Sequence, residues 1–273
     1  MTDTPMNSPV EAHDSLDTPV EQGMAMPWLA VYKRELGQYF RSPVAYGIAF
    51  AILFLLGVLF NGYVSQANGQ VPADSTYAPG LLTFLTFLIA PLLTMRLLAE
   101  ESREGTLEVL MTMPMSEAQF IIGKFLAAWT YYTVLLALTL VYHVILISIG
   151  TPDMGAAFGA YVGAWLYGGA VLAVTLIWSA VTEDQIVAAF LGAATVLVLY
   201  LAEIAAAVVG GSAATTGASG LSEFIRQLGL QAHYDSTLAR GIIRAEDIVY
   251  FIFMIVGALF ITVRIVETRR WRS

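Results

Sequence analysis

The chain alternates between long apolar runs and short polar connections. Six of the runs are long enough to cross a bilayer, because a helix needs about 20 apolar residues to span the hydrocarbon core. They cover residues 44–63, 80–98, 125–149, 156–181, 185–209 and 248–266. The pattern therefore predicts an all-α polytopic membrane protein with six transmembrane helices.

Two of the predicted spans contain residues that change how helices pack. Pro91 lies inside the second span, where the missing backbone donor predicts a kink or a break near residues 89–91. Gly155, Gly159 and Gly163 recur every four residues at the start of the fourth span, and glycine at this spacing lets a neighbouring helix come close. The close neighbour lies either within the same bundle or in another subunit.

A shorter amphipathic segment precedes the first span, at residues 27–43. One of its helical faces is apolar and mostly aromatic: Trp28, Tyr32, Leu36, Tyr39 and Phe40. The other face is polar and mostly basic: Lys33, Arg34, Gln38 and Arg41. Pro27 suits the first helical turn, and Pro43 ends the segment. Such a helix is expected to lie at the interface, in the headgroup plane of a membrane.

The distribution of Lys and Arg orients the predicted spans. With both termini in the cytoplasm, ten Lys and Arg residues fall on the cytoplasmic side and three fall outside, in agreement with the positive-inside rule. We expect an acidic tail at 1–26, the interfacial helix at 27–43, a six-span transmembrane domain at 44–267 and a basic cytoplasmic tail at 268–273. Two longer connections are expected, a cytoplasmic loop at 96–124 and an extracytoplasmic loop at 210–247.

Composition supports the bilayer as the main solvent. The chain is 58% hydrophobic and 12% charged, and soluble domains have about 25% charged residues. Most of the net charge of −8 comes from residues 1–26, which hold five acidic residues and no Lys or Arg. This tail is expected to be disordered, and it lacks the features of a signal peptide. The absence of Cys excludes disulfides and thiolate metal sites.

Charge gathers between the second and third spans, in the segment 95–114. Five ionisable residues stand close together there: Arg96, Glu100, Glu101, Arg103 and Glu104. A charged, helix-forming stretch between two spans can serve as a contact surface for a soluble partner. An ordinary solvated loop has the same composition, so both interpretations stay open.

Two ionisable residues fall inside the spans, His143 in the third and Glu203 in the fifth. Each lies about six residues from the outer end of its span, which places it roughly 9 Å below the interface. Such groups are costly in a membrane and usually face a partner or a wet cavity. We expect either that both face the bundle interior at one level, as a polar pathway, or that each makes a separate structural contact.

The sequence lacks the motifs of common catalytic and metal sites. Gly123-Lys124 is followed by Phe125 and has no glycine five residues earlier, so no phosphate-binding loop occurs. No His-Glu-x-x-His or Gly-x-Ser-x-Gly motif is present. His233 and Asp235 in the outer loop are too few to hold a metal ion. We therefore expect neither a metal site nor enzymatic activity in this chain.

The segment 93–128 (LTMRLLAEESREGTLEVLMTMPMSEAQFIIGKFLAA) resembles the signature of ABC-2-type permeases, the membrane subunits of one class of ATP-driven transporters. The residues that carry the resemblance are Arg96, Ala99, Glu100, Glu101, Gly105, Thr106, Glu108, Leu110, Pro114, Ser116, Gly123 and Lys124. The outer segment 233–250, with Arg240, Gly241 and Asp247, resembles the gliding-motility-associated ABC permeases.

The resemblance implies a coupling helix that docks on a separate ATP-binding subunit. Carried over to this chain, the docking residues are Glu100, Glu101, Arg103, Glu104, Gly105, Thr106 and Glu108. ATP and Mg would then be bound by the partner, with no cofactor on this chain. The resemblance also implies a dimer with a second copy or a related permease, a bacterial cell membrane, export of a substrate, and no nucleic-acid partner.

Two other functions remain open. The chain could be a non-transporting anchor or a force-transmitting component of a gliding-type assembly. It could also be a proton-coupled secondary transporter in which Glu203 and His143 carry protons. The substrate is not specified, because apolar spans with few polar residues suit lipids, lipid-linked polysaccharides, hydrophobic drugs and peptides equally well.

Overall fold

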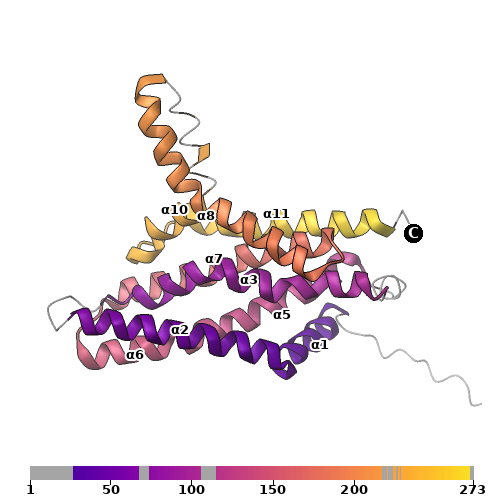
Figure 1. Ribbon diagram of the computed structural model, residues 1–273, viewed down its shortest axis with the longest axis horizontal. Coiled ribbons are helices and arrows are strands. Elements are labelled where there is room, and N and C mark those ends of the chain that lie inside the picture. The colour runs from indigo at the N-terminus through magenta and orange to yellow at the C-terminus, as the bar shows by residue number, and fades with distance from the viewer. Residues whose placement is uncertain are drawn as a thin grey trace, which may run out of the picture.

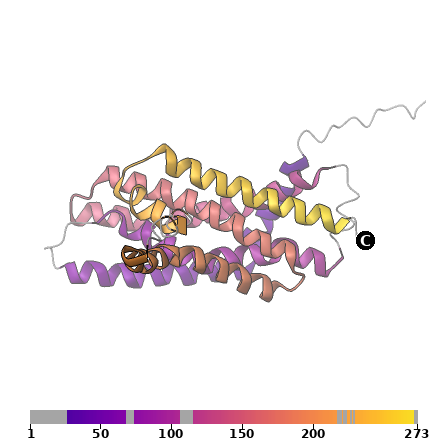
Figure 2. The same cartoon turned by 90° about the horizontal axis from the view of Figure 1, so that it is seen from above.

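Most of the long helices run side by side along the longest axis of the protein, and the last part of α8 (Gln185–Thr216) projects away from them (Figures 1 and 2). The computed structural model describes residues 27–67, 74–105, 115–216, 220, 224, 225, 227 and 229–270, and this part of the chain contains no β-strand. The elements in chain order are α1 (Pro27–Arg41), α2 (Pro43–Ala67), α3 (Tyr77–Arg103), α5 (Glu117–Leu138), α6 (Leu140–Ile149), α7 (Met154–Val181), α8 (Gln185–Thr216), α10 (Leu230–Asp235), η1 (Leu238–Arg240) and α11 (Ala245–Arg270).

The six transmembrane helices expected from the apolar runs are confirmed within the described residues. The third span consists of two consecutive helices, α5 and α6, which are separated at Thr139. The hydroxyl of Thr139 donates to the Leu136 carbonyl at 2.7 Å. The span from Glu117 to Ile149 is thus longer than one straight crossing requires, and it changes helix at a buried threonine.

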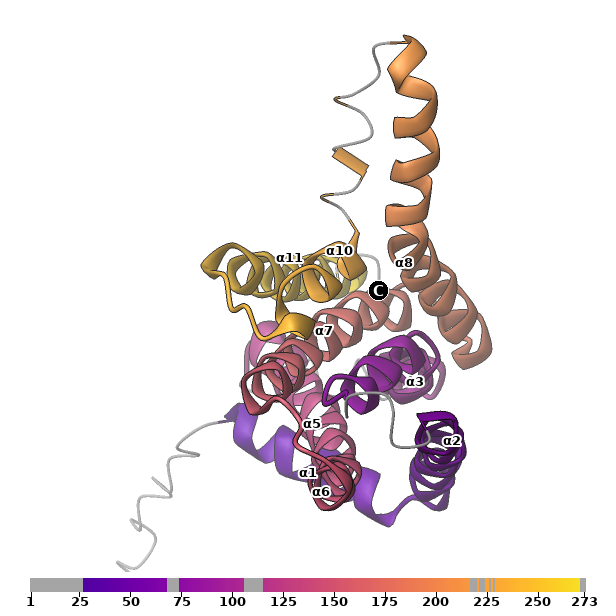
Figure 3. The same cartoon turned by 90° about the vertical axis from the view of Figure 1, so that its left-hand side faces the viewer.

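Helix α7 lies at the centre of the bundle. Within its most apolar window, 78% of the residues are buried, against 17% for α2 and 22% for α11. Figure 3 shows α7 beside α3, with α11 and α8 on one side and α5 below. The outer helices carry exposed apolar side chains such as Phe50, Phe190 and Phe253, as expected of surfaces that face lipid.

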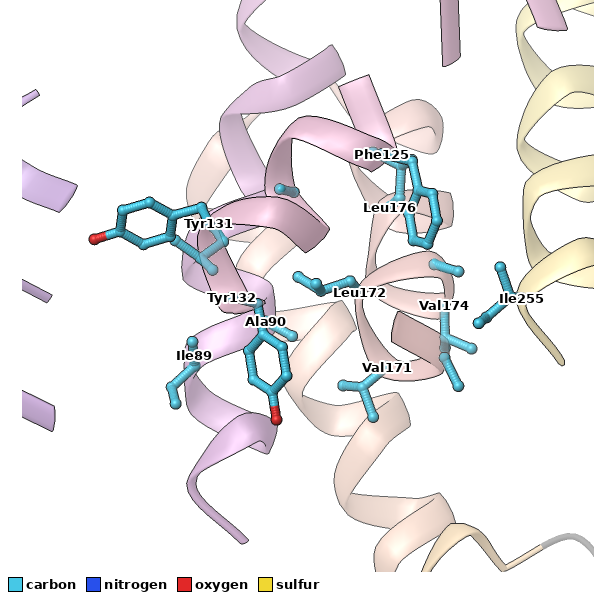
Figure 4. Packing of buried hydrophobic residues seen from close by; sticks show 14 of the residues in the cluster. Ile89, Ala90, Phe125, Tyr131, Tyr132, Val171, Leu172, Val174, Leu176 and Ile255 are labelled. Atoms are coloured by element: carbon cyan, nitrogen blue, oxygen red, sulfur yellow. The ribbon is translucent and has the colours of Figure 1, made fainter. Parts of the chain in front are cut away.

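Small residues allow aromatic side chains to fill the space between α5 and α7. A Cβ at Gly168 would lie 2.0 Å from Cε1 of Tyr132, and one at Gly169 would lie 2.8 Å from Cε2 of Trp129. Tyr132 lies beside Ile89 and Ala90 of α3 (Figure 4). Its hydroxyl donates to the Ala164 carbonyl at 3.1 Å, so this buried polar group is satisfied.

The glycines at the start of α7 pack against the outer segment of the same chain. A Cβ at Gly159 would lie 2.6 Å from the Cα of Gly241, and one at Gly163 would lie 2.7 Å from the Cβ of Leu238. Gly241 itself has φ +77, a conformation that favours glycine. Of the two neighbours that the sequence leaves open, the structure therefore shows one within the same chain.

Several boundaries differ from the sequence prediction. A kink or a break was expected at Pro91; helix α3 continues through this residue, so there is no break, and the kink stays a prediction. It also continues to Arg103, and α5 begins at Glu117, which makes the connection expected over 96–124 shorter. Helix α8 continues to Thr216, past the point where the outer loop was expected to begin, and α11 reaches Arg270. The acidic tail expected at 1–26 lies outside the described residues.

Candidate functional site

A charged cleft opens at the end of the bundle where α1 meets the C-terminus of α3 and the N-terminal half of α5. Its volume is about 1000 Å³. Nine of its lining residues carry charge: Lys33, Arg34, Arg41, Arg96, Lys124, Glu35, Glu100, Glu101 and Glu104. We call this the α1–α3 cleft.

The floor of the cleft is a buried group of ion pairs centred on Lys124. Its Nζ lies 3.0 Å from Oε1 of Glu35 and 2.9 Å from Oε1 of Glu101. The exposed fractions of these residues are only 1% for Lys124, 3% for Glu35 and 7% for Glu101. Nη2 of Arg34 approaches the same two carboxylates, at 3.0 Å from Glu101 and 3.4 Å from Glu35. Two cations thus face two carboxylates, and we call the group the ion-pair cluster.

The ion-pair cluster joins three helices that are distant in sequence. Arg34 and Glu35 belong to α1, Glu101 to α3, and Lys124 to α5. Removing one member of a buried ion pair costs about 3–5 kcal/mol, because the remaining charge is left without compensation. The cluster therefore holds the end of α3 firmly between α1 and α5.

Sequence reasoning missed Glu35. It lies with Val31 and Tyr39 on the buried face of α1, and these residues are four positions apart. The exposed basic face is confirmed, since Lys33, Arg34 and Arg41 are all exposed. The four-residue spacing that Glu35 shares with these two residues could have indicated that Glu35 is buried. The aromatic pattern of the same helix was more conspicuous, and the spacing was overlooked. The position of α1 in the headgroup plane stays a prediction.

Arg96 is held at the other side of the cleft, where α1 ends and α2 begins. Its guanidinium lies 5.1 Å from the centroid of the Tyr39 ring, and Nη1 donates to Oγ of Ser42 at 3.3 Å. The Tyr39 hydroxyl donates to the Leu93 carbonyl at 2.7 Å. Burial raises the pKa of the Tyr39 phenol, and the nearby Arg96 cation only partly opposes this, so the phenol stays a donor. The aromatic ring is a fixed platform for the guanidinium.

The structure divides the predicted docking residues into two groups. Glu101 points into the ion-pair cluster, whereas Arg103, Glu104 and Gly105 are exposed and Glu100 is half-buried. Gly105 has φ +69 and follows the last turn of α3, a common way to end a helix. Thr106 and Glu108 lie outside the described residues. The exposed members lie together at the tip of α3.

The predicted intramembrane pair is not brought together by the described helices. His143 belongs to α6 and Glu203 to α8, and Figures 1 and 3 place these helices on different sides of the bundle. Nε2 of His143 lies 3.3 Å from Sδ of Met154, which is a local contact between α6 and α7. The side chain of Glu203 is outside the described part, so the polar pathway stays a prediction.

The outer segment forms its own polar group. Nδ1 of His233 lies 2.9 Å from Oδ1 of Asp247, and the Thr237 hydroxyl donates to Oδ2 of Asp247 at 2.6 Å. Asp235 instead accepts from the amide of Gln231 at 2.5 Å. His233 and Asp235 therefore have separate partners, and within the described residues no three His, Asp or Glu side chains are arranged to hold a metal ion.

The six apolar helices define the chain as an integral membrane protein. It belongs to the ABC-2 family of transporter proteins, because the model "ABC-2 family transporter protein" matches residues 29–266. It is also similar to "Probable ABC transporter permease protein NosY" of Pseudomonas aeruginosa, with 35% identity over 109 residues. That match covers 38% of this chain and 38% of the relative. The chain is thus a membrane protein of the ABC-2 transporter family.

Proposed function

We propose that this permease is driven by a separate ATP-binding subunit that docks on the tip of α3. The observation that carries the proposal is the division of the charged residues at the end of α3: Arg103 and Glu104 are exposed, while Glu101 is buried one turn earlier. An exposed tip supplies contacts for a soluble partner. Glu101 is buried directly behind the tip and fixes the end of α3. Local motion of the helix end would therefore not break the contact with the partner.

The same helix connects the tip with the centre of the bundle. The Ser179 hydroxyl of α7 donates to the Met95 carbonyl of α3 at 3.0 Å, and the Thr94 hydroxyl donates to that of Thr175 at 3.0 Å. Closure of two ATP-binding subunits would push on the tip, and a continuous helix would carry the displacement to α7. These contacts support the proposed transmission of motion from the tip of α3 to α7.

The proposal extends to the complete transporter. The family implies an ATP-binding partner, which would hold ATP and Mg. We further propose that two permeases form the transporter, either two copies or a pair of related chains, in a bacterial cell membrane with both termini in the cytoplasm. Export is the proposed direction. The likeness of segment 233–250 to gliding-motility-associated permeases stays a prediction.

Copurification with the ATP-binding subunit tests the docking surface. The variant Glu100→Lys/Glu104→Lys reverses two charges at the tip, and we expect it to lose most of the bound subunit while keeping its thermal stability. Glu101 is unsuitable for this purpose, because its replacement would disrupt the ion-pair cluster. Glu267→Lys is the control, since its only recorded partner within the described part is Arg264, in an exposed pair that contributes little.

Undiminished copurification by the Glu100→Lys/Glu104→Lys variant would reject the docking surface. Loss of the subunit by Glu267→Lys to the same extent would also reject it, because the effect would then follow from charge alone. Transport that continues without any ATPase, and depends on an ion gradient, would favour the secondary transporter instead.

A further inference from the structure

The half of the α1–α3 cleft that lies next to α2 carries unneutralised positive charge. Arg41 and Arg96 both line it, together with Gln38 and Ser42, and we call this half the elbow. The ion pairs recorded for the described residues include neither Arg41 nor Arg96. The elbow is thus a cationic pocket with a hydroxyl and an amide beside it.

The other half of the cleft is different, because its buried cations are already paired. Lys124 and Arg34 share the carboxylates of Glu35 and Glu101. Of the remaining acids, Glu104 caps α3 eight residues beyond Arg96, which corresponds to about 12 Å along the helix axis. Glu100 is one turn from Arg96 and makes no ion pair with it. Arg41 and Arg96 at the elbow thus lie in no ion pair with a carboxylate of the described residues.

Exposed apolar side chains occur at the end of α1 and along the first two turns of α2. The exposed fractions are 40% for Phe40, 60% for Val44 and 71% for Phe50, and the last two belong to α2, a candidate membrane span. A cationic pocket at the end of a lipid-facing helix meets both parts of a phospholipid. Its phosphate would lie at the elbow, and its acyl chains would lie along α2.

We propose that the elbow is a binding site for the phosphate of an anionic glycerophospholipid. Guanidinium groups bind phosphate oxygens through paired N–H donors, and basic pockets on the cytoplasmic side of transmembrane helices bind anionic headgroups. Arg96 is oriented in advance by the Tyr39 ring and by Ser42, which lowers the cost of ordering it on binding. Lipid binding at the elbow is separate from the proposed coupling to an ATP-binding subunit and does not require that subunit.

Native mass spectrometry of the purified permease with added phosphatidylglycerol or phosphatidylcholine tests the site. We expect phosphatidylglycerol to bind more tightly than phosphatidylcholine. Arg96→Gln and Arg41→Gln should each weaken phosphatidylglycerol binding about fivefold, the effect of losing one cation near a lipid surface. Arg41 is exposed, so its variant keeps the test valid if Arg96→Gln proves unstable.

Arg264→Gln is the matched control. It removes one positive charge from the same end of the bundle, but it lies on α11 and pairs with Glu267 at 2.9 Å. We expect phosphatidylglycerol to bind this variant as tightly as the original chain. Equal losses in all three variants would reject the site, as would equal affinity for the two lipids.

Two further measurements exclude other occupants. Millimolar inorganic phosphate should leave phosphatidylglycerol bound, because the acyl chains contribute to affinity, and displacement by free phosphate would assign the elbow to a soluble anion. Copurification with the ATP-binding subunit should be unchanged in Arg41→Gln. Loss of the subunit in that variant would assign the elbow to the partner and overturn the lipid proposal, whatever the result at the tip of α3.

Discussion

Lys124 shows how one residue determines the arrangement of an entire corner of the bundle. A fully buried ammonium group is stable only when carboxylates face it, and here Glu35 and Glu101 do so at 3.0 and 2.9 Å. Nζ of Lys124 also lies 5.0 Å from the centroid of the Phe120 ring. Neither carboxylate is close to Lys124 in sequence, so the pairing depends on the tertiary fold.

Replacing Lys124 should destabilise the protein strongly. Lys124→Met removes the buried cation that faces both carboxylates and leaves the half-exposed Arg34 beside them, and the expected loss is about 3–5 kcal/mol. Thermal unfolding of the purified protein in detergent measures it. Adding Glu101→Leu should recover part of the loss, since Arg34 and Glu35 then form a balanced pair. A double variant less stable than Lys124→Met would contradict this account of the ion-pair cluster.

At the same scale, the sequence indicated the tip of α3 but not the direction of its side chains. The five charges between 96 and 104 were conspicuous against apolar surroundings. Whether Glu101 faces water or the bundle depends on where Lys124 lies, which periodicity within one segment does not reveal. Lys124 was noted in the failed phosphate-loop motif and in the family signature, but not as a partner of Glu101, because buried lysines are rare.

Among the elements, the outer segment with α10 and η1 is held by specific polar contacts. Asp247 is 4% exposed and accepts from both His233 and Thr237, and the ring of His233 stacks on Tyr250 with centroids 3.9 Å apart. The segment thus attaches to the start of α11 through one carboxylate. Gly241 places its other side against α7.

Loss of the Asp247 carboxylate should open this segment locally. We expect Asp247→Asn to speed amide hydrogen exchange in residues 230–241 by about tenfold or more, since hydrogen bonds to charged groups contribute about 1.5–3 kcal/mol. The exchange of α7 should not change. Glu246→Gln is the control, because Glu246 is exposed in the same turn. Equal exchange in the two variants would show that the carboxylate does not hold the segment.

Helix positions followed from the sequence more completely than helix contacts did. Apolar runs of this length permit one interpretation, because backbone groups in lipid must be paired within a helix. Pro91 did not break α3, since the helix is enclosed by its neighbours there and Pro91 is buried. The contact of Gly159 with Gly241 could not be predicted from the sequence. The four-residue spacing of the glycines indicates that another segment packs closely against them, but it does not identify that segment.

For the whole molecule, the orientation in the membrane is the property that the docking proposal needs most. The positive-inside bias of ten to three comes from the sequence. It places the tip of α3 and the connection between α7 and α8 on the cytoplasmic side, and α10 on the opposite side. The chain has no Cys, so a single introduced thiol reports on its own position.

Labelling of single-Cys variants tests this orientation. In intact cells a membrane-impermeant maleimide should label Ser236→Cys, in the outer segment, and should not label Glu183→Cys, between α7 and α8. Both positions are exposed, so both should react after the membrane is opened. Labelling of Glu183→Cys alone in intact cells would invert the topology and place the tip of α3 away from any cytoplasmic ATPase.

The burial of α7 has a consequence for how the protein is made. Of the six candidate spans, α7 is the most buried and the least hydropathic, because glycine and alanine replace larger side chains where Tyr132 and Trp129 pack. Its weak attraction for lipid makes it the poorest candidate to enter the bilayer alone. Helices α3 and α5 leave the ribosome earlier and offer the surface that α7 fits. Insertion of the fourth span therefore relies on α3 and α5 being already present, and the outer helices α8 and α11, which follow α7 in the chain, close the bundle last.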